Sequence, residues 1–188
     1  LSPGETPYEN AQFLLFLCAV IKAVDDYQDL LRISVATAGN DHRLGANEAP
    51  PAVVSIFLGD ELNAILEAIE TGAPYNASEK TQMKLGVNVL PRFTRDTTDR
   101  NRTSPFAFTG NKFEFRMLGS SNSIACANIM LNTAVAESLK IYADRLEKAT
   151  IDTIEEGYMT KDLAMITTLP EVHVLNSEGF IKAIAERL

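Results

Sequence analysis

The stretch that decides the fold lies at residues 99–119 and reads DRNRTSPFAFTGNKFEFRMLG. Its second half alternates charged and apolar residues over positions 112–117, and strict alternation indicates a strand with one buried face. The apolar set is expected to face a core and consists of Phe113, Phe115 and Met117. The charged set shares the opposite face and consists of Lys112, Glu114 and Arg116. A carboxylate and a guanidinium on one strand face can serve a metal ion and an anionic ligand side by side.

The composition places the chain among soluble globular proteins. Its 188 residues suffice for one domain with a hydrophobic core, 46% of them are hydrophobic, and the mean hydropathy is -0.02. A net charge of -8 argues against nucleic acid as a partner. The longest apolar run, residues 13–24, is interrupted by Lys22 and is shorter than the ~20 residues of a membrane-spanning helix. With no secretory signal recognised, we expect a cytoplasmic protein without a membrane partner.

Two cysteines occur, Cys18 and Cys126, and each lies within an apolar helical pattern. Isolated cysteines of this kind are typical of a reducing compartment. Both are therefore expected to be buried free thiols rather than partners in a disulfide.

Helical periodicity outlines most of the chain around the opening stretch. Apolar residues three to four apart predict a helix over residues 13–31 and another that runs for about seven turns from near residue 124. Residues 59–70 predict a third helix, with acidic residues in the first turn where the helix dipole favours them. Asn176 caps a final helix. Its inward-facing residues are expected to be Phe180, Ile181, Ile184, Ala185 and Leu188.

Two further segments predict strands. Residues 52–58 form a nearly continuous apolar run between a double proline and a glycine, which is typical of a buried strand. Within residues 82–91, the alternation of Leu85, Val87 and Val89 with other residues predicts a short strand. Together with the alternating stretch at residues 112–118, these segments indicate the α+β class.

The polar side chains outside the opening stretch admit more than one interpretation. Asp25 and Asp26 form either a metal pair or a solvated helix face, and the second is favoured because adjacent acids on a helix usually face water. His42 is favoured as a hydrogen-bonded structural residue over a catalytic one. Arg43 and Glu48 are better binding candidates, because a polar loop between a helix and a strand is where binding residues tend to lie.

Three motifs carry a resemblance to a known family. They are Ser2-Pro3-Gly4, the loop NDHRLGANEAPP at residues 40–51, and above all residues 99–119 with their continuation to Leu139. Over residues 1–146 the chain resembles an interior portion of the catalytic region of type III glutamine synthetases. The resemblance implies antiparallel strands of a catalytic half barrel packed with long helices. It also implies an ATP-dependent ligase with Mg²⁺ or Mn²⁺, which phosphorylates glutamate and lets ammonia displace the phosphate.

The resemblance also implies a role for individual residues. Arg43 looks like the arginine that holds the substrate glutamate, and Arg116 resembles its partner at the carboxylate. Glu48 looks like the flap glutamate that helps deprotonate ammonium, although it lies one residue closer to Arg43 than in the smaller enzymes. Arg102 resembles the arginine that stabilises the transferring phosphoryl group, and Glu114 resembles a divalent-metal ligand.

The chain departs from the family pattern at two points. Smaller glutamine synthetases carry a second phosphate-binding arginine five residues after the first, and that position is Ala107 here. Arg100 or Lys112 is expected to bind nucleotide phosphate in its place, beside Arg102. A single carboxylate such as Glu114 does not hold Mg²⁺ firmly. The remaining metal ligands of the family are expected to precede the first residue of this chain.

Residues 147–188 carry a second resemblance. Residues 146–164 look like the carboxyl-terminal segment of NADP-dependent isocitrate dehydrogenases, and residues 176–188 resemble their last helix. The isocitrate-binding and metal-binding residues of such an enzyme are absent, which disfavours a dehydrogenase. We therefore predict a partial glutamine-synthetase-like catalytic domain at residues 1–146 and a helical tail at residues 147–188. A natural fusion, a recombinant chimera and a generated sequence would all have this pattern.

The sequence leaves two functions open. The favoured one is ligation of ammonia to glutamate with ATP, incomplete in the isolated chain. The alternative is a folded non-catalytic module or scaffold with at most anion or nucleotide affinity. The members of the family are homo-oligomeric. For this chain a monomeric state is the alternative, because much of the subunit surface is absent.

Overall fold

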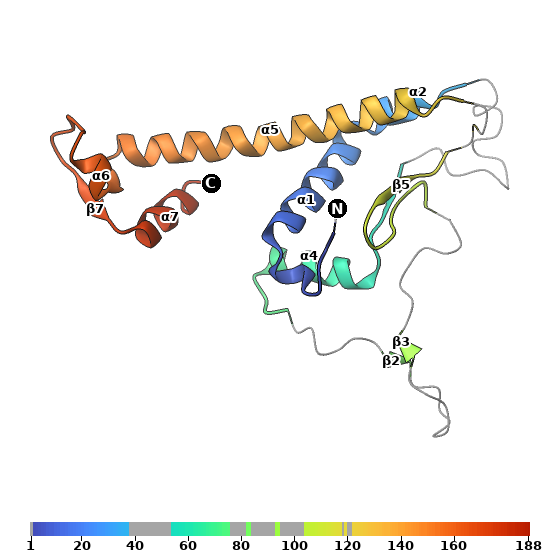
Figure 1. Cartoon of the computed structure of the whole chain (residues 1–188), viewed down its shortest axis with the longest axis horizontal. Helices are drawn as coiled ribbons and strands as arrows, with labels where there is room; N and C mark the ends of the chain where they lie inside the picture. Colours follow the sequence, from blue (N-terminus) through green and yellow to red (C-terminus); the bar gives the residue numbers. More distant parts are fainter. Residues whose placement is uncertain are drawn as a thin grey trace. The chain divides into compact units, whose positions relative to one another are not determined.

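The computed structural model describes residues 2–37, 54–75, 82–83, 93–94, 104–117, 119 and 122–188 (Figure 1). It divides into two compact units, Leu1–Val135 and Ala136–Leu188. Both helices and small sheets are present, so the predicted α+β class is confirmed. Within the described ranges, no helix combines the length and hydrophobicity needed to span a membrane.

The first unit begins with helices that follow the predicted apolar periodicity. The short 3-10 helix η1, Pro7–Glu9, leads into α1, Ala11–Asp26, and α2, Gln28–Ser34. The chain turns at Tyr27, so the predicted single helix is two consecutive helices. Helix α4, Asp60–Thr71, confirms the third prediction and ends at Gly72 in the left-handed conformation.

A three-stranded sheet stands beside these helices. Strand β1, Ile56–Phe57, pairs in parallel with β4, Phe106–Phe108, and β4 pairs antiparallel with β5, Phe113–Phe115. The expectation of antiparallel strands is therefore correct for β5 and wrong for β1. The predicted strand covered residues 52–58, of which the structure describes residues 54–58. Within these, β1 occupies only Ile56–Phe57, so the strand is also shorter than predicted.

Strand β4 was not predicted from the sequence. All three of its residues are buried, so they carry no alternation of polar and apolar side chains by which a strand could be recognised. Two further strands, β2 at Gln82–Met83 and β3 at Phe93–Thr94, pair antiparallel with each other. Of the strand expected within residues 82–91, the structure describes residues 82–83, which form β2, whereas the alternating residues 85–89 lie outside the described residues.

The core of the first unit joins the helices to the sheet. One cluster brings α1 and α4 against β4 and contains Phe13, Leu17, Leu62, Ile65 and Phe108. A second cluster contains Val20, Val24, Leu31, Val54 and Phe106. The predicted apolar face of the alternating strand packs on this second cluster and comprises Phe113, Phe115 and Met117. The prediction made from alternation is thereby confirmed.

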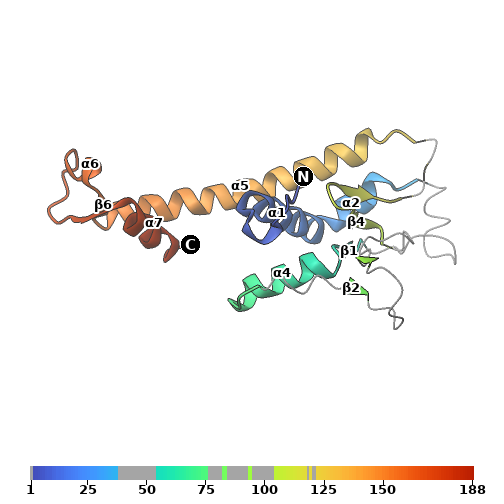
Figure 2. The same ribbon diagram turned by 60° about the horizontal axis from the view of Figure 1, so that its bottom comes forward.

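The second unit is formed by the end of the long helix and the chain that follows it. Helix α5, Ala125–Glu155, confirms the predicted helix and spans both units. Strands β6, Tyr158–Thr160, and β7, His173–Leu175, pair in parallel, with α6, Lys161–Ala164, between them. Helix α7, Ser177–Ala185, completes the unit, and Figure 2 shows α6, β6 and α7 gathered at the end of α5.

Burial differs from expectation at five side chains. In α7 the Asn176 cap is confirmed, because its side chain accepts a hydrogen bond from the Gly179 amide at 2.8 Å. Ile181 and Leu188 are 66% and 51% exposed, however, and Ala185 is exposed as well, so the prediction that these three face inward is wrong. Cys18 is half-buried and Cys126 is exposed, and both are free thiols. The predicted burial of Cys126 is therefore also wrong.

Candidate functional site

Three of the charged side chains predicted to form a site lie in one row on the β4–β5 hairpin. Lys112 ends the turn, Glu114 lies in the middle of β5, and Arg116 follows the strand. The Arg116 amide donates a hydrogen bond to the Pro105 carbonyl at 2.7 Å. This bond joins the residue that follows β5 to the residue that precedes β4. The common strand face predicted for these residues thus places their side chains together.

The Glu114 carboxylate holds the row together. The Nε and Nη2 atoms of Arg116 each lie 3.0 Å from Oε2 of Glu114. The Nζ atom of Lys112 lies 3.7 Å from the other oxygen, Oε1. Arg116 is 15% exposed and Lys112 is 66% exposed, so the guanidinium is the shielded partner. The cluster carries two positive charges against one negative charge, which suits an anionic ligand.

Packed phenylalanine rings support the row from the opposite face of the hairpin. The ring centroid of Phe106 lies 5.3 Å from that of Phe113 and 6.1 Å from that of Phe115. Phe108 packs on Phe113 at 5.2 Å. These contacts lock the pleat that points the charged side chains to one side.

Ala107 lies opposite Glu114 in the hairpin register and is completely buried. By the family resemblance, this is the position of a second phosphate-binding arginine in the smaller enzymes. The space around this completely buried methyl group holds no larger side chain unless its neighbours move, so arginine does not fit the position in this structure.

The remaining predicted site residues fall outside the described ranges. They are His42, Arg43, Glu48, Arg100 and Arg102. The structure therefore brings together Lys112, Glu114 and Arg116 and leaves the positions of the others as predictions.

The donors do not fit a divalent cation by themselves. In the part of the chain that the structure describes, no group of three or more His, Cys, Asp or Glu side chains could hold a metal ion. Both oxygens of Glu114 face cationic groups, whereas Mg²⁺ requires several oxygen ligands in near-octahedral geometry. The alternative metal pair at Asp25 and Asp26 is also not supported, because Asp26 forms an ion pair with Lys22 at 2.6 Å.

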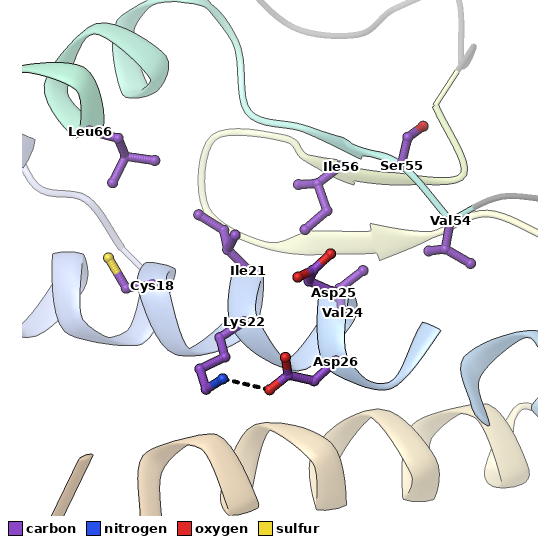
Figure 3. Close-up of a pocket in the computed structure, with 10 residues that line it drawn as sticks. All are labelled: Cys18, Ile21, Lys22, Val24, Asp25, Asp26, Val54, Ser55, Ile56 and Leu66. Atoms are coloured by element: carbon purple, nitrogen blue, oxygen red, sulfur yellow. Dashed lines mark hydrogen bonds and ion pairs between the residues drawn. The ribbon is translucent and has the colours of Figure 1, made fainter. Parts of the chain in front are cut away.

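Two hollows in the first unit were not anticipated from the sequence. The first is a cavity of about 580 Å³. Figure 3 shows that Ile21 and Asp25 of α1 face Ile56 of β1 in this cavity. Cys18 also lines it, and burial raises the pKa of the Cys18 thiol. A second hollow of about 650 Å³ is lined by the opening loop, including Gly4, and by Gly110 of the hairpin turn. The opening motif and the hairpin are thereby brought together.

Comparison with known proteins relates most of the chain to one class of enzyme. The type-3 glutamine synthetase of Dictyostelium discoideum is 56% identical over 146 residues, which is 78% of this chain and 20% of that protein. The glutamine synthetase of Bacteroides fragilis is 49% identical over 180 residues, which is 94% of this chain and 24% of that protein. The chain thus spans between a fifth and a quarter of the length of these relatives. No family model matches it.

A shorter part of the chain is similar to a different enzyme. The NADP isocitrate dehydrogenase of Nicotiana tabacum is 46% identical over 55 residues, which is 28% of this chain and 13% of that protein. The shares matched by the Bacteroides and Nicotiana proteins together exceed the whole chain, so the matched spans overlap. Both resemblances identified from the sequence are confirmed.

Proposed function

We propose, on the premise that most of this chain is similar to glutamine synthetases, that it carries part of an active site for ligating ammonia to glutamate with ATP. The observation that supports the proposal most is the identity of 56% over 146 residues, within a chain whose charged row has the composition of an anion site. Glutamate, ammonia and ATP are the proposed substrates. Cytoplasmic location and homo-oligomeric assembly stay part of the proposal.

In this proposal the residues of the first unit bind substrate groups. Arg116 clamps a carboxylate of glutamate, because a planar guanidinium matches a carboxylate with parallel hydrogen bonds. Arg43 holds the same substrate from the loop at residues 40–51. Lys112 neutralises nucleotide phosphate together with Arg100, since phosphoryl transfer needs cations along the path of the moving charge.

The two remaining roles concern the transfer itself. Arg102 stabilises the phosphoryl group as it moves, and Glu48 takes a proton from ammonium so that ammonia can attack. In this proposal, the segments that carry Arg102 and Glu48 form a catalytic half barrel together with β1, β4 and β5. Residues 1–146 constitute the partial catalytic domain and residues 147–188 the appended tail.

The proposed reaction also requires Mg²⁺ or Mn²⁺, which would neutralise the charge of the transferring phosphoryl group. Among the described residues Glu114 is the one carboxylate in the row, and cations face both of its oxygens. The role of metal ligand that the resemblance implies for Glu114 therefore needs further ligands and a rearranged Glu114. The roles proposed for Arg43, Glu48, Arg102 and Arg116 do not involve the metal ion.

The competing function is a folded non-catalytic module with anion or nucleotide affinity only. It is favoured by one specific observation: both oxygens of Glu114 face cationic groups, so the charged row fits an anion better than a divalent cation. Both functions predict anion binding at Lys112 and Arg116. They differ in turnover and in the involvement of Arg102 and Glu48.

Calorimetric unfolding of the full chain, with and without glutamate and Mg-ATP, tests the proposal. A ligand that binds the folded state at a hundredfold excess over its Kd adds about 2.7 kcal/mol of stability and raises the midpoint. We expect Arg116→Ala to abolish the shift caused by glutamate. Arg145→Ala, in the second unit, is the matched control and should retain it. A shift without glutamine formation would support the non-catalytic module, and no shift with either ligand would contradict both.

A further inference from the structure

The contacts of Glu114 point to a role different from metal coordination. Its Oε2 atom accepts a hydrogen bond from Nε of Arg116 at 3.0 Å and forms an ion pair with Nη2 of the same guanidinium, also at 3.0 Å. Two contacts to one oxygen fix the direction of the guanidinium plane more strictly than one contact would. The pair also links residues two apart on one strand face, so both side chains start from a fixed pleat.

The surroundings make this pair more persistent than an exposed ion pair. The Arg116 side chain is largely shielded, and its backbone amide is bonded to the Pro105 carbonyl. Shielding weakens screening by solvent and salt, which limits most surface pairs. The exposed pair between Lys182 and Glu178 in α7 provides the contrast, because both of its side chains lie in solvent.

A divalent cation at Glu114 would compete with both cationic neighbours. The Oε2 atom faces Arg116 and the Oε1 atom faces Lys112. A metal ion bound to either oxygen would lie within a few ångströms of a guanidinium or an ammonium, where like charges repel. No cluster of metal-ligating side chains among the described residues offsets this repulsion.

We infer that Glu114 is a positioning residue of this chain, which orients Arg116 for an oxyanion and does not ligate a divalent cation. The inference rests on the proposed function in one respect, namely that Arg116 binds the carboxylate of glutamate. The Nε and Nη2 atoms of the guanidinium are directed to Oε2 of Glu114. A guanidinium carries five N–H donors in a planar fork, a geometry that a carboxylate matches.

Nuclear magnetic resonance of the full, isotopically labelled chain tests the ion pair directly. The Nε–H resonance of Arg116 should exchange slowly with water in the native chain. Glu114→Gln should accelerate that exchange at least tenfold, because the charged acceptor is lost. Glu178→Gln, which breaks an exposed pair in the second unit, should leave the Arg116 signal unchanged. Fast exchange of Arg116 Nε–H in the native chain would overturn the inference.

Titration with Mn²⁺ tests the second half of the inference in the native chain, without any variant. Paramagnetic broadening should not select the amides of Phe113, Glu114 and Phe115 over the rest of the chain. Selective broadening of these amides that Glu114→Gln removes would identify Glu114 as a metal ligand and overturn the inference.

Titration with glutamate separates failure of the inference from failure of the proposed function. We expect Glu114→Gln to bind glutamate about tenfold more weakly than the native chain, because Arg116 loses its charged anchor. Equal binding by the two chains would overturn the positioning role. Absence of glutamate binding in the native chain would instead overturn the proposed function, while the exchange of Arg116 Nε–H would still report on the ion pair.

Discussion

At the scale of single residues, Gly157 shows how closely the backbone of the second unit is packed. It follows α5 with a φ of 89°, and its carbonyl accepts a hydrogen bond from the His173 amide at 2.8 Å. A Cβ atom at this position would lie 2.7 Å from the carbonyl oxygen of Glu171. Both the dihedral angle and the contact therefore require glycine.

Gly157→Ala is expected to lower the free energy of unfolding by about 1 to 3 kcal/mol, because a left-handed alanine and a clash with backbone coincide. Urea denaturation followed by circular dichroism measures the change. Gly110→Ala is the matched control, since its φ is 97° but no atom lies within 4 Å of the added Cβ. An equal loss in both variants would show that the contact with Glu171 contributes nothing.

The two cysteines are expected to differ in reactivity. Burial raises the pKa of the Cys18 thiol, so less of it is the reactive thiolate at a given pH, whereas Cys126 is exposed. A thiol reagent at pH 8 should therefore modify Cys126 before Cys18, and raising the pH should accelerate modification of Cys18. Mass spectrometry of digested samples taken over time measures both rates. Equal rates in the folded chain would contradict the prediction.

At the scale of elements, Asn10 joins the opening loop to α1. Its side-chain oxygen accepts a hydrogen bond from the Phe13 amide at 3.0 Å, which caps the helix, and its Nδ2 atom donates to the Pro3 carbonyl at 3.3 Å. Asn10→Ala should cost about 1 kcal/mol of stability, because both bonds are lost. Asn10→Asp keeps the capping oxygen and loses only the donor to Pro3, so it should cost less. Thermal unfolding of the two variants measures the difference, and an equal loss would assign the effect to the loop contact.

The elements also show what a sequence pattern can and cannot predict. Alternation predicted β5 and its buried face, because one face meets the core and the other meets charged side chains. Strand β4 is buried on both faces, so its Phe-Ala-Phe sequence carries no period. The direction of β1 was wrongly predicted because strand pairing depends on contacts between distant segments, which local periodicity does not encode. Strands β6 and β7, of three residues each, are too short to produce a period.

The candidate site was predictable to a similar extent. A shared strand face predicted that Lys112, Glu114 and Arg116 lie together, and the structure places them so. The sequence could not predict that both oxygens of Glu114 contact cations, since this depends on side-chain conformations. Arg43, Glu48, Arg100 and Arg102 stay predictions.

At the scale of the whole molecule, the two units each have their own hydrogen-bonded strands, β4 with β5 in the first and β6 with β7 in the second. Gly157→Ala should therefore speed hydrogen exchange of the amides of β6 and β7 and leave those of β4 and β5 unchanged, because local opening follows local packing. Exchange measured by mass spectrometry on the full chain resolves the two sets. An equal acceleration in both sets would show that the chain unfolds as one cooperative unit.

Ala107 has a consequence for how this chain could change over evolutionary time. It is completely buried and lies opposite Glu114 in the hairpin register. A larger side chain at a completely buried position forces its neighbours to move and costs stability, so an arginine at position 107 would require further substitutions around it. Over evolutionary time, a stronger phosphate site is therefore reached at lower cost through the exposed position of Lys112 than through position 107.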